Sequence, residues 1–299
     1  MRFPTIVVAT VALGAILAAA PSASAGVSGY TFTTISVPGS SDTGFFGLGI
    51  NNLGQIVGDY DFGQYGFLYT RGNYSTFDVP GAIGTEPSAI NDWGQIVGYY
   101  CCDSGGGAHG FLDTNRKFTN IDVPGTVGST FPTGINDRDQ IVGSFFNTSG
   151  EHAFLDTRGV FTIIDVPGAL PGGTFAPFGI NNTGQIVGSY YNGVSSYGRY
   201  GFLDTRGVFT SIDVPGSVFT ETTGINDFGQ IVGISCGGAC TTAPGFLDTN
   251  GNFTFFNAPG AVYTFPEGIN DLGQIIGFFT TAREISTVSS QRRHMASQR

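Results

Sequence analysis

The sequence predicts an all-β protein, a β-propeller of about six four-stranded blades. Two observations predict it: a composition typical of strands and turns, and phrases that recur about every 44 residues. The 299 residues include 48 glycines, 27 phenylalanines and 12 tyrosines, and only 11% are charged. Helical bundles and coiled coils need Glu, Lys, Leu and Ala in bulk, so this composition excludes them.

Three phrases make up the repeat. The phrase Gly-Ile-Asn-x-x-Gly-Gln-Ile-Val-Gly has its first isoleucine at Ile50, Ile90, Ile135, Ile180, Ile225 and Ile269. The phrase Phe-Thr-x-Ile-Asp-Val-Pro-Gly has its proline at Pro38, Pro80, Pro124, Pro167, Pro215 and Pro259. The phrase Gly-Phe-Leu-Asp-Thr has its phenylalanine at Phe67, Phe111, Phe154, Phe202 and Phe246.

Each phrase is typical of a strand with its turn. Residues 161–166 are β-branched and aromatic, and Pro167-Gly168 then suits a type II turn. Residues 225–233 predict strand, tight turn and strand, because Asn and Asp bond their own backbone and glycine accepts a positive φ. Residues 202–209 predict a second hairpin that turns at Arg206-Gly207. Four short strands per repeat of this length are typical of a propeller blade.

The repeats by themselves do not supply every strand that a closed ring needs. The first strand predicted is residues 32–37, and the sixth Gln-Ile-Ile-Gly ends at Gly277 without a sixth Gly-Phe-Leu. We expect residues 278–286 to complete the last blade, because an open edge strand is a liability. The propeller domain is predicted to span residues 26–282, followed by a basic, disordered tail at 283–299.

The first 25 residues have the pattern of a secretory signal peptide. Arg2 supplies the positive charge, residues 6–20 are apolar, and Ala23-Ser24-Ala25 is a small-residue cleavage site. We therefore expect cleavage after Ala25, a secreted, extracellular protein, and no membrane span in the mature chain. The net charge of −10 argues against nucleic acid as a partner, since that binding neutralises phosphates with Lys and Arg.

The repeats resemble the HAF family of extracellular bacterial repeat proteins, named for a His-Ala-Phe tripeptide. The tripeptide is present as His152-Ala153-Phe154, and His109-Gly110-Phe111 stands one repeat earlier. The resemblance covers about 250 residues and implies an exported protein with propeller-like repeats. It implies no established activity, and it brings no catalytic residue to this chain.

The candidate ligand-binding residues are Tyr65, His109, His152 and Tyr200. They occupy equivalent positions before the Gly-Phe-Leu strand, beside the variable loops. Aromatic rings there suit stacking on sugars, since they offer an apolar face and a polar tip. A second aromatic set follows Gln-Ile-Val-Gly at Tyr60, Tyr100, Phe145, Tyr190 and Phe279. For the second set, packing between neighbouring blades is the favoured interpretation.

Other polar groups have a structural interpretation that we prefer. The Asn-Asp turns offer at most one carboxylate each, too few for calcium, so we expect side-chain-bonded turns and no metal site. The acids before Val-Pro-Gly (Asp78, Asp122, Asp165 and Asp213) either cap strand ends or, if they line a central channel, form a carboxylate ring. Cys236 and Cys240 are a candidate disulfide in a short loop, whereas Cys101 and Cys102 are adjacent.

The sequence carries no catalytic motif and implies no cofactor. Glu86, Glu221 and Glu267 fall in what we predict to be the same inter-strand loop of three repeats. They are the candidates for the alternative hypothesis, a propeller-type glycoside hydrolase or lyase. The favoured hypothesis is a secreted, non-catalytic binding or surface-structural module whose partner is an extracellular polysaccharide or a surface protein.

Overall fold

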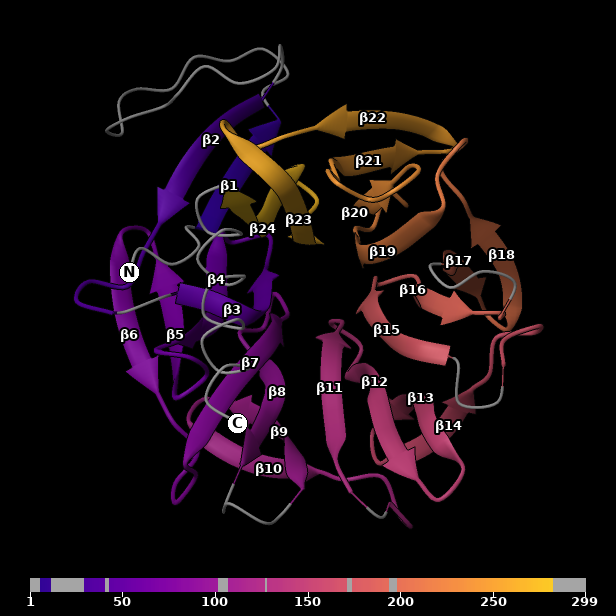
Figure 1. Ribbon diagram of the computed structural model, residues 1–299. Coiled ribbons are helices and arrows are strands. Elements are labelled where there is room, and N and C mark those ends of the chain that lie inside the picture. Colours follow the sequence, from indigo (N-terminus) through magenta and orange to yellow (C-terminus); the bar gives the residue numbers. More distant parts are fainter. Residues whose placement is uncertain are drawn as a thin grey trace, which may run out of the picture.

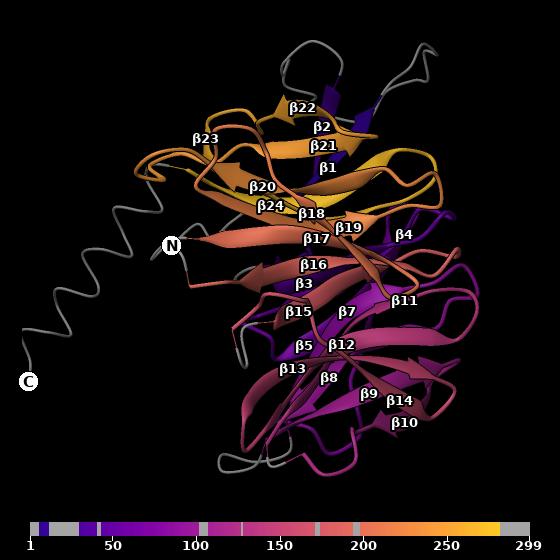
Figure 2. The same ribbon diagram turned by 90° about the vertical axis from the view of Figure 1, so that its right-hand side faces the viewer.

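The strands form six four-stranded antiparallel sheets arranged around a central axis (Figures 1 and 2). The computed structural model describes residues 6–11, 30–40, 43–101, 107–126, 128–170, 174–193 and 198–281. Within these residues every regular element is a strand. The prediction of an all-β propeller with six four-stranded blades is confirmed.

Five blades consist of four consecutive strands, numbered outward from the axis. Blade 1 comprises β3 (Thr43–Ile50), β4 (Gln55–Tyr60), β5 (Tyr65–Thr70) and β6 (Asn73–Phe77). Blade 2 comprises β7 (Gly84–Ile90), β8 (Ile96–Cys101), β9 (Ala108–Thr114) and β10 (Lys117–Ile121). Blade 3 comprises β11 (Thr130–Ile135), β12 (Gln140–Asn147), β13 (Gly150–Thr157) and β14 (Val160–Ile164).

Blades 4 and 5 follow the same plan. Blade 4 comprises β15 (Thr174–Ile180), β16 (Gln185–Tyr191), β17 (Arg199–Thr205) and β18 (Val208–Ile212). Blade 5 comprises β19 (Phe219–Ile225), β20 (Ile231–Cys236), β21 (Gly245–Thr249) and β22 (Asn252–Phe256). The first strand of each blade lies at the axis, because residues of all six first strands line the central cavities.

Blade 6 is built from both ends of the chain. Its order is β23 (Ala261–Ile269), β24 (Gln274–Thr281), β1 (Ile6–Val11) and β2 (Tyr30–Ile35). The indigo and yellow strands therefore meet in one sheet (Figure 1). The prediction that residues 278–286 supply the missing strand is wrong, because residues 278–281 extend β24 and β1 takes the third position. Apart from Ile6–Val11, the predicted signal peptide lies outside the described residues, as does the tail at 283–299.

The predicted turns are present. The amide of Ala169 donates to the carbonyl oxygen of Val166 (3.1 Å) across Pro167-Gly168, and Gly168 has φ 86°, as a type II turn requires. At the turn of the second predicted hairpin, which joins β17 to β18, Arg206 and Gly207 both have positive φ, 57° and 85°. Two such residues make the type I′ turn that matches the twist of the flanking strands.

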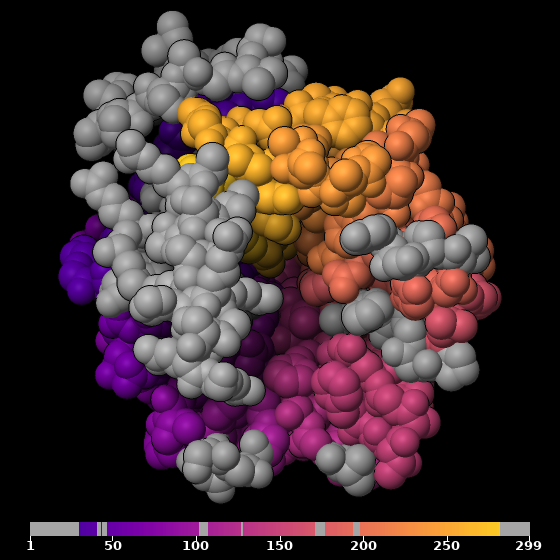
Figure 3. All heavy atoms as spheres, viewed as in Figure 1, coloured from indigo at the N-terminus to yellow at the C-terminus, as the bar shows by residue number. Residues whose placement is uncertain are grey.

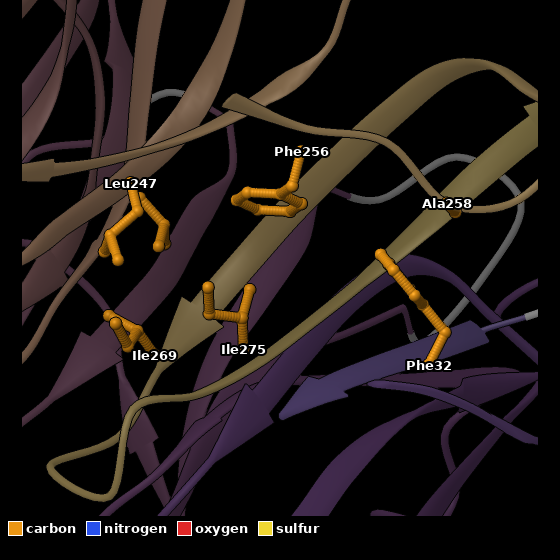
Figure 4. Packing of buried hydrophobic residues seen from close by; sticks show 7 residues of the cluster. Phe32, Leu247, Phe256, Ala258, Ile269 and Ile275 are labelled. Carbon is orange, nitrogen blue, oxygen red and sulfur yellow. The ribbon is translucent and has the colours of Figure 1, made fainter. Parts of the chain in front are cut away.

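The hydrophobic core lies between neighbouring blades. The phenylalanine of each Gly-Phe-Leu phrase is essentially inaccessible to solvent. Figure 4 shows one of these clusters, in which Leu247 and Phe256 of blade 5 face Ile269 and Ile275 of blade 6. Each blade thus completes its neighbour's core, which explains why the repeats form a closed ring.

Candidate functional site

The two ends of the propeller carry different chemistry. At one end, called here the turn end, lie the six tight turns between first and second strands. At the other, called the loop end, first strands begin and second strands run into the loops that precede third strands. Cavities of about 90 and 80 Å³ lie along the axis, the first lined by the turn-end residues. The surface is hollowed near the centre of the ring in Figure 3.

The turn end is held by a closed ring of six asparagines. In each turn the Asn Oδ1 accepts two backbone amides of its own turn, as Asn136 does from Arg138 and Gln140 (3.0 and 3.1 Å). Its Nδ2 donates to the carbonyl oxygen of the equivalent asparagine in the next blade, at 2.9–3.2 Å. The members are Asn51, Asn91, Asn136, Asn181, Asn226 and Asn270.

A second ring lies beside the first. The residue that follows each ring asparagine donates its backbone amide to the side-chain Oδ1 of the equivalent residue in the next blade, at 2.7–2.9 Å. In ring order the members are Asn52, Asp92, Asp137, Asn182, Asp227 and Asp271. The two asparagines stand opposite each other, and each donates from Nδ2 to both flanking carboxylates (2.8–3.0 Å). This arrangement separates the four acids into two pairs.

These bonds confirm that the Asn-Asp turns are side-chain-bonded. Both oxygens of each ring carboxylate accept hydrogen bonds from the chain itself. In the described part of the chain, no group of three or more His, Cys, Asp or Glu has a geometry that would hold a metal ion. The turn end therefore ties the blades together.

The four candidate binding residues lie together at the loop end. Each lies within the first three residues of a third strand and packs on the aromatic ring opposite it in the same blade. The pairs are Tyr65 with Tyr60, His109 with Tyr100, His152 with Phe145 and Tyr200 with Tyr190, with centroids 5.2–5.6 Å apart. The second aromatic set also packs between blades, as predicted: Tyr100 and Phe145 each belong to a core cluster shared with the preceding blade. Blades 1 to 4 are consecutive, so the four ring pairs form an arc around this end.

The two histidines differ in their surroundings. His109 Nδ1 lies 3.1 Å from Asp122 Oδ2, and 41% of its side chain is exposed. His152 Nε2 lies 2.8 Å from Ser149 Oγ, and its Nδ1 lies 3.8 Å from Asp165. His109 therefore offers the more accessible polar group to a ligand.

The acids before Val-Pro-Gly do not form a ring in the channel. Asp78, Asp122, Asp165 and Asp213 follow fourth strands, which are the outermost of each blade, so the channel hypothesis is wrong. Their contacts are local: Asp122 with His109, and Asp213 with Ser211 Oγ (2.7 Å). Their position nevertheless brings carboxylates to the loop end.

The three candidate glutamates belong to first strands, not to a loop. Glu86 lies in β7, Glu221 in β19 and Glu267 in β23. The loop prediction is wrong because these strands begin earlier than their apolar pattern indicates. Each strand has a β-bulge close to its glutamate, between Pro87 and Ala89, between Thr222 and Gly224, and at Glu267 itself. Glu267 lines the axial cavity.

These acids interact with one another across the loop end of the channel. Burial, together with the carboxylates of Glu221 and Asp59, raises the pKa of Glu267 to about 8. Burial also raises the pKa of Glu86 to about 7, against the lowering effect of the Tyr99 hydroxyl, which donates to Glu86 Oε2. The sequence analysis missed Asp59 and Tyr99, although both follow the glycine of Gln-Ile-Val-Gly in their repeats.

Glu221 forms an ion pair with Arg199, also missed from the sequence. Arg199 begins β17 next to the candidate Tyr200, and its guanidinium also lies over the Phe219 ring at 5.6 Å from the centroid. This contact joins the aromatic arc of blade 4 to the acids of blade 5. The only signal in the sequence was the basic residue directly before the aromatic position.

The candidate disulfide is present in the structure, where Cys236 and Cys240 are bonded. It closes the loop after β20 at the loop end, and the buried Cys236 packs with Ile234 and Ala243. Cys102 lies outside the described residues.

The solved structures most informative about the fold are propellers. The chain is similar to a putative TolB from Agrobacterium tumefaciens, with 9% identity over 93% of this chain and 99% of that one and a TM-score of 0.64. TolB from Acinetobacter baumannii matches with 10% identity over 85% of this chain and 64% of that one, at a TM-score of 0.55. Virginiamycin B lyase from Staphylococcus aureus matches with 12% identity over 85% of this chain and 86% of that one, at a TM-score of 0.48.

No protein-family model matches the chain, and no curated protein matches it by sequence. At identities this low, the two TolB structures support the fold alone. Among the described residues, no helix is long and apolar enough to cross a membrane.

Proposed function

We propose that this protein is an exported, non-catalytic binding module whose loop end recognises an extracellular polysaccharide. The observation that supports the proposal best is the arc of four ring pairs in blades 1 to 4. The proposal includes cleavage after Ala25 and kinship with the HAF repeat proteins. A surface protein is the second class of partner that this end suits.

The loop end combines the two kinds of group that sugar recognition uses. Partly exposed rings such as Tyr65 and Tyr200 offer apolar faces on which a pyranose ring stacks. Neighbouring polar groups, among them His109 and Asp122, offer donors and acceptors for hydroxyl groups. Repetition in consecutive blades favours a polymer, because linked weak contacts add avidity.

Co-sedimentation with a panel of insoluble cell-wall and matrix polysaccharides tests this function. We expect selective retention that Tyr65→Ala and Tyr200→Ala each weaken. Trp93→Ala is the matched control, because Trp93 is an exposed aromatic residue at the turn end. Retention on none of the polysaccharides, or equal loss in the Trp93 variant, would exclude the loop end as a carbohydrate site.

Catalysis is the alternative, and the raised pKa values favour it specifically. A carboxyl group with a pKa of about 7 or 8 holds its proton near neutral pH, as a general acid for glycoside cleavage requires. Product release from the same polysaccharides would then be lost in Glu86→Gln or Glu267→Gln. Unchanged turnover in both variants would rule out these acids.

A surface-structural role makes a different prediction. It requires the purified protein to self-associate without a small ligand. Sedimentation velocity over a wide concentration range decides this point, and a monomer at high concentration would exclude it.

A further inference from the structure

The third strand of blades 1 to 5 follows one template. The phenylalanine of Gly-Phe-Leu-Asp-Thr lies directly across from the glycine of Gln-Ile-Val-Gly, as Phe246 does from Gly233. A Cβ atom on Gly233 would come within 2.7 Å of the Phe246 ring, so the glycine makes room for the phenylalanine. The fourth strand adds an outer aromatic ring, Phe253 in this blade, with its centroid 5.5 Å from that of Phe246.

Blade 6 retains the residues that flank the third strand in the other blades. Gly277 holds the glycine position on β24, and Phe32 on β2 holds the position of the outer ring. Phe32 is almost fully buried, beside Phe256 and Ile275 (Figure 4). A small cavity is lined by Phe32, Gly277 and Pro266, among others.

The strand that lies between them does not match the template. The register places Val7 opposite Gly277, Val8 opposite Ile276 and Ala9 opposite Ile275. Val7 stands where five blades have phenylalanine, and Ala9 stands where four of them have a buried aspartate. The aspartate of the template accepts the amide of its own turn, as Asp204 Oδ1 does from Gly207 (2.6 Å), and alanine has no such acceptor.

We propose that the space between β24 and β2, the blade 6 slot, is an acceptor site for an extended strand of another protein chain. The incoming strand pairs with both neighbours and places a phenylalanine opposite Gly277. Pairing on both sides satisfies its backbone groups, and the phenylalanine ring fills the space beside Phe32. Removal of residues 1–25, as proposed above, vacates the slot. In the full chain the incoming strand displaces β1, whose sequence lacks the phenylalanine and the aspartate of the other third strands.

The ligand is therefore a peptide strand with the pattern Gly-Phe-Leu-Asp-Thr. Specificity rests on the phenylalanine, since the ladder of main-chain hydrogen bonds is independent of sequence. The site is separate from the aromatic arc, which lies in blades 1 to 4. Failure of carbohydrate binding therefore leaves this proposal standing, and the converse also holds.

Titration of the full chain with a fluorescent peptide tests the proposal. The probe is Tyr-Gly-Phe-Leu-Asp-Thr-Arg-Gly, the sequence of residues 200–207, and the matched control peptide has glycine in place of phenylalanine. We expect saturable binding at one peptide per chain by fluorescence anisotropy, and at least tenfold weaker binding of the control peptide. Equal binding of the two peptides, or no binding of the first, would overturn the proposal.

Two further measurements locate the site. Val8→Pro removes a ladder hydrogen bond from β1, which is a central strand, so the variant should bind the probe more tightly than the native chain does. A benzophenone in place of the phenylalanine ring should cross-link to β2, β24 or the Phe256 region, as mapped by mass spectrometry. Cross-links confined to other blades would refute the proposal. Mapping that finds residues 282–299 or a second copy of the chain in the blade 6 slot would also refute it.

Discussion

Asn270 in blade 6 donates from its side-chain amide to the backbone carbonyl oxygen of Asn51 in blade 1, at 2.9 Å. The two residues are 219 positions apart in the sequence, and this bond completes the ring that the other five asparagines form. The amide of Asp271 and the Asn52 side chain complete the second ring in the same place, at 2.7 Å. The turn end thus closes the propeller independently of the third strand of blade 6.

Asn136→Ala should destabilise the protein by about 3 kcal/mol. The variant leaves the amides of Arg138 and Gln140 and the carbonyl oxygen of Asn181 without their side-chain partner, in a turn whose asparagine is buried. Urea unfolding followed by circular dichroism measures the change. Asn73→Ala, at the exposed first residue of β6, should change stability by less than about 0.5 kcal/mol. Equal effects of the two substitutions would contradict a stabilising role for the ring.

Asn182→Asp should be more damaging at neutral pH than in acid. Asn182 donates to Asp137 Oδ2 and Asp227 Oδ2, so an aspartate there loses both bonds and adds a third charge between two carboxylates. We expect a loss of about 3 kcal/mol at pH 7 and a smaller loss near pH 3, because acid weakens charge repulsion between carboxylates. Thermal unfolding of the variant and the native chain at both pH values measures this. A loss that does not depend on pH would show that repulsion is unimportant.

The raised pKa of Glu267 should make stability depend on pH. Since its pKa is about 8 when folded and near 4.5 when unfolded, the folded state binds the proton more tightly. Its contribution is therefore complete at low pH and is lost as the pH rises from about 4.5 through 8. Glu267→Gln keeps the neutral form at every pH, so it should flatten the decline in Tm between pH 5 and pH 9.

Glu221→Gln is the comparison for that experiment. It removes the partner of Arg199 and should therefore lower Tm near neutral pH, whereas Glu267→Gln should raise Tm at pH 9. If both variants follow the native pH profile, the channel acids do not control it.

Loss of the disulfide should have a small effect. The bond between Cys236 and Cys240 closes a loop with a sequence separation of only 4, so the unfolded chain loses little entropy from it. We expect the double variant Cys236→Ala/Cys240→Ala to lose about 2 kcal/mol or less by chemical unfolding. A much larger loss would mean that the bond positions the loop for packing against Tyr263, whose hydroxyl donates to the Cys240 carbonyl oxygen (2.9 Å).

Local chemistry explains why much of the blade was predictable. Pro167-Gly168 and Arg206-Gly207 carry their turn types in their own backbone preferences, and Asn226 bonds within its own turn. The glutamates were harder to place, because a charged residue inside a strand looks like a loop residue in the sequence. Arg199 was missed for a similar reason, since its partner Glu221 belongs to the next blade.

The sequence by itself determined the repeat, the four strands of each unit and the residues that end them, because these depend on contacts between residues close along the chain. Only the tertiary structure decided which residues meet across blades: Asn270 with Asn51, Glu221 with Arg199, and Gly277 with a strand from the other end of the chain. These contacts follow from the packing of blades on one another and from ring closure, which together join residues about 20 to 270 positions apart. No periodic pattern within one repeat encodes that distance.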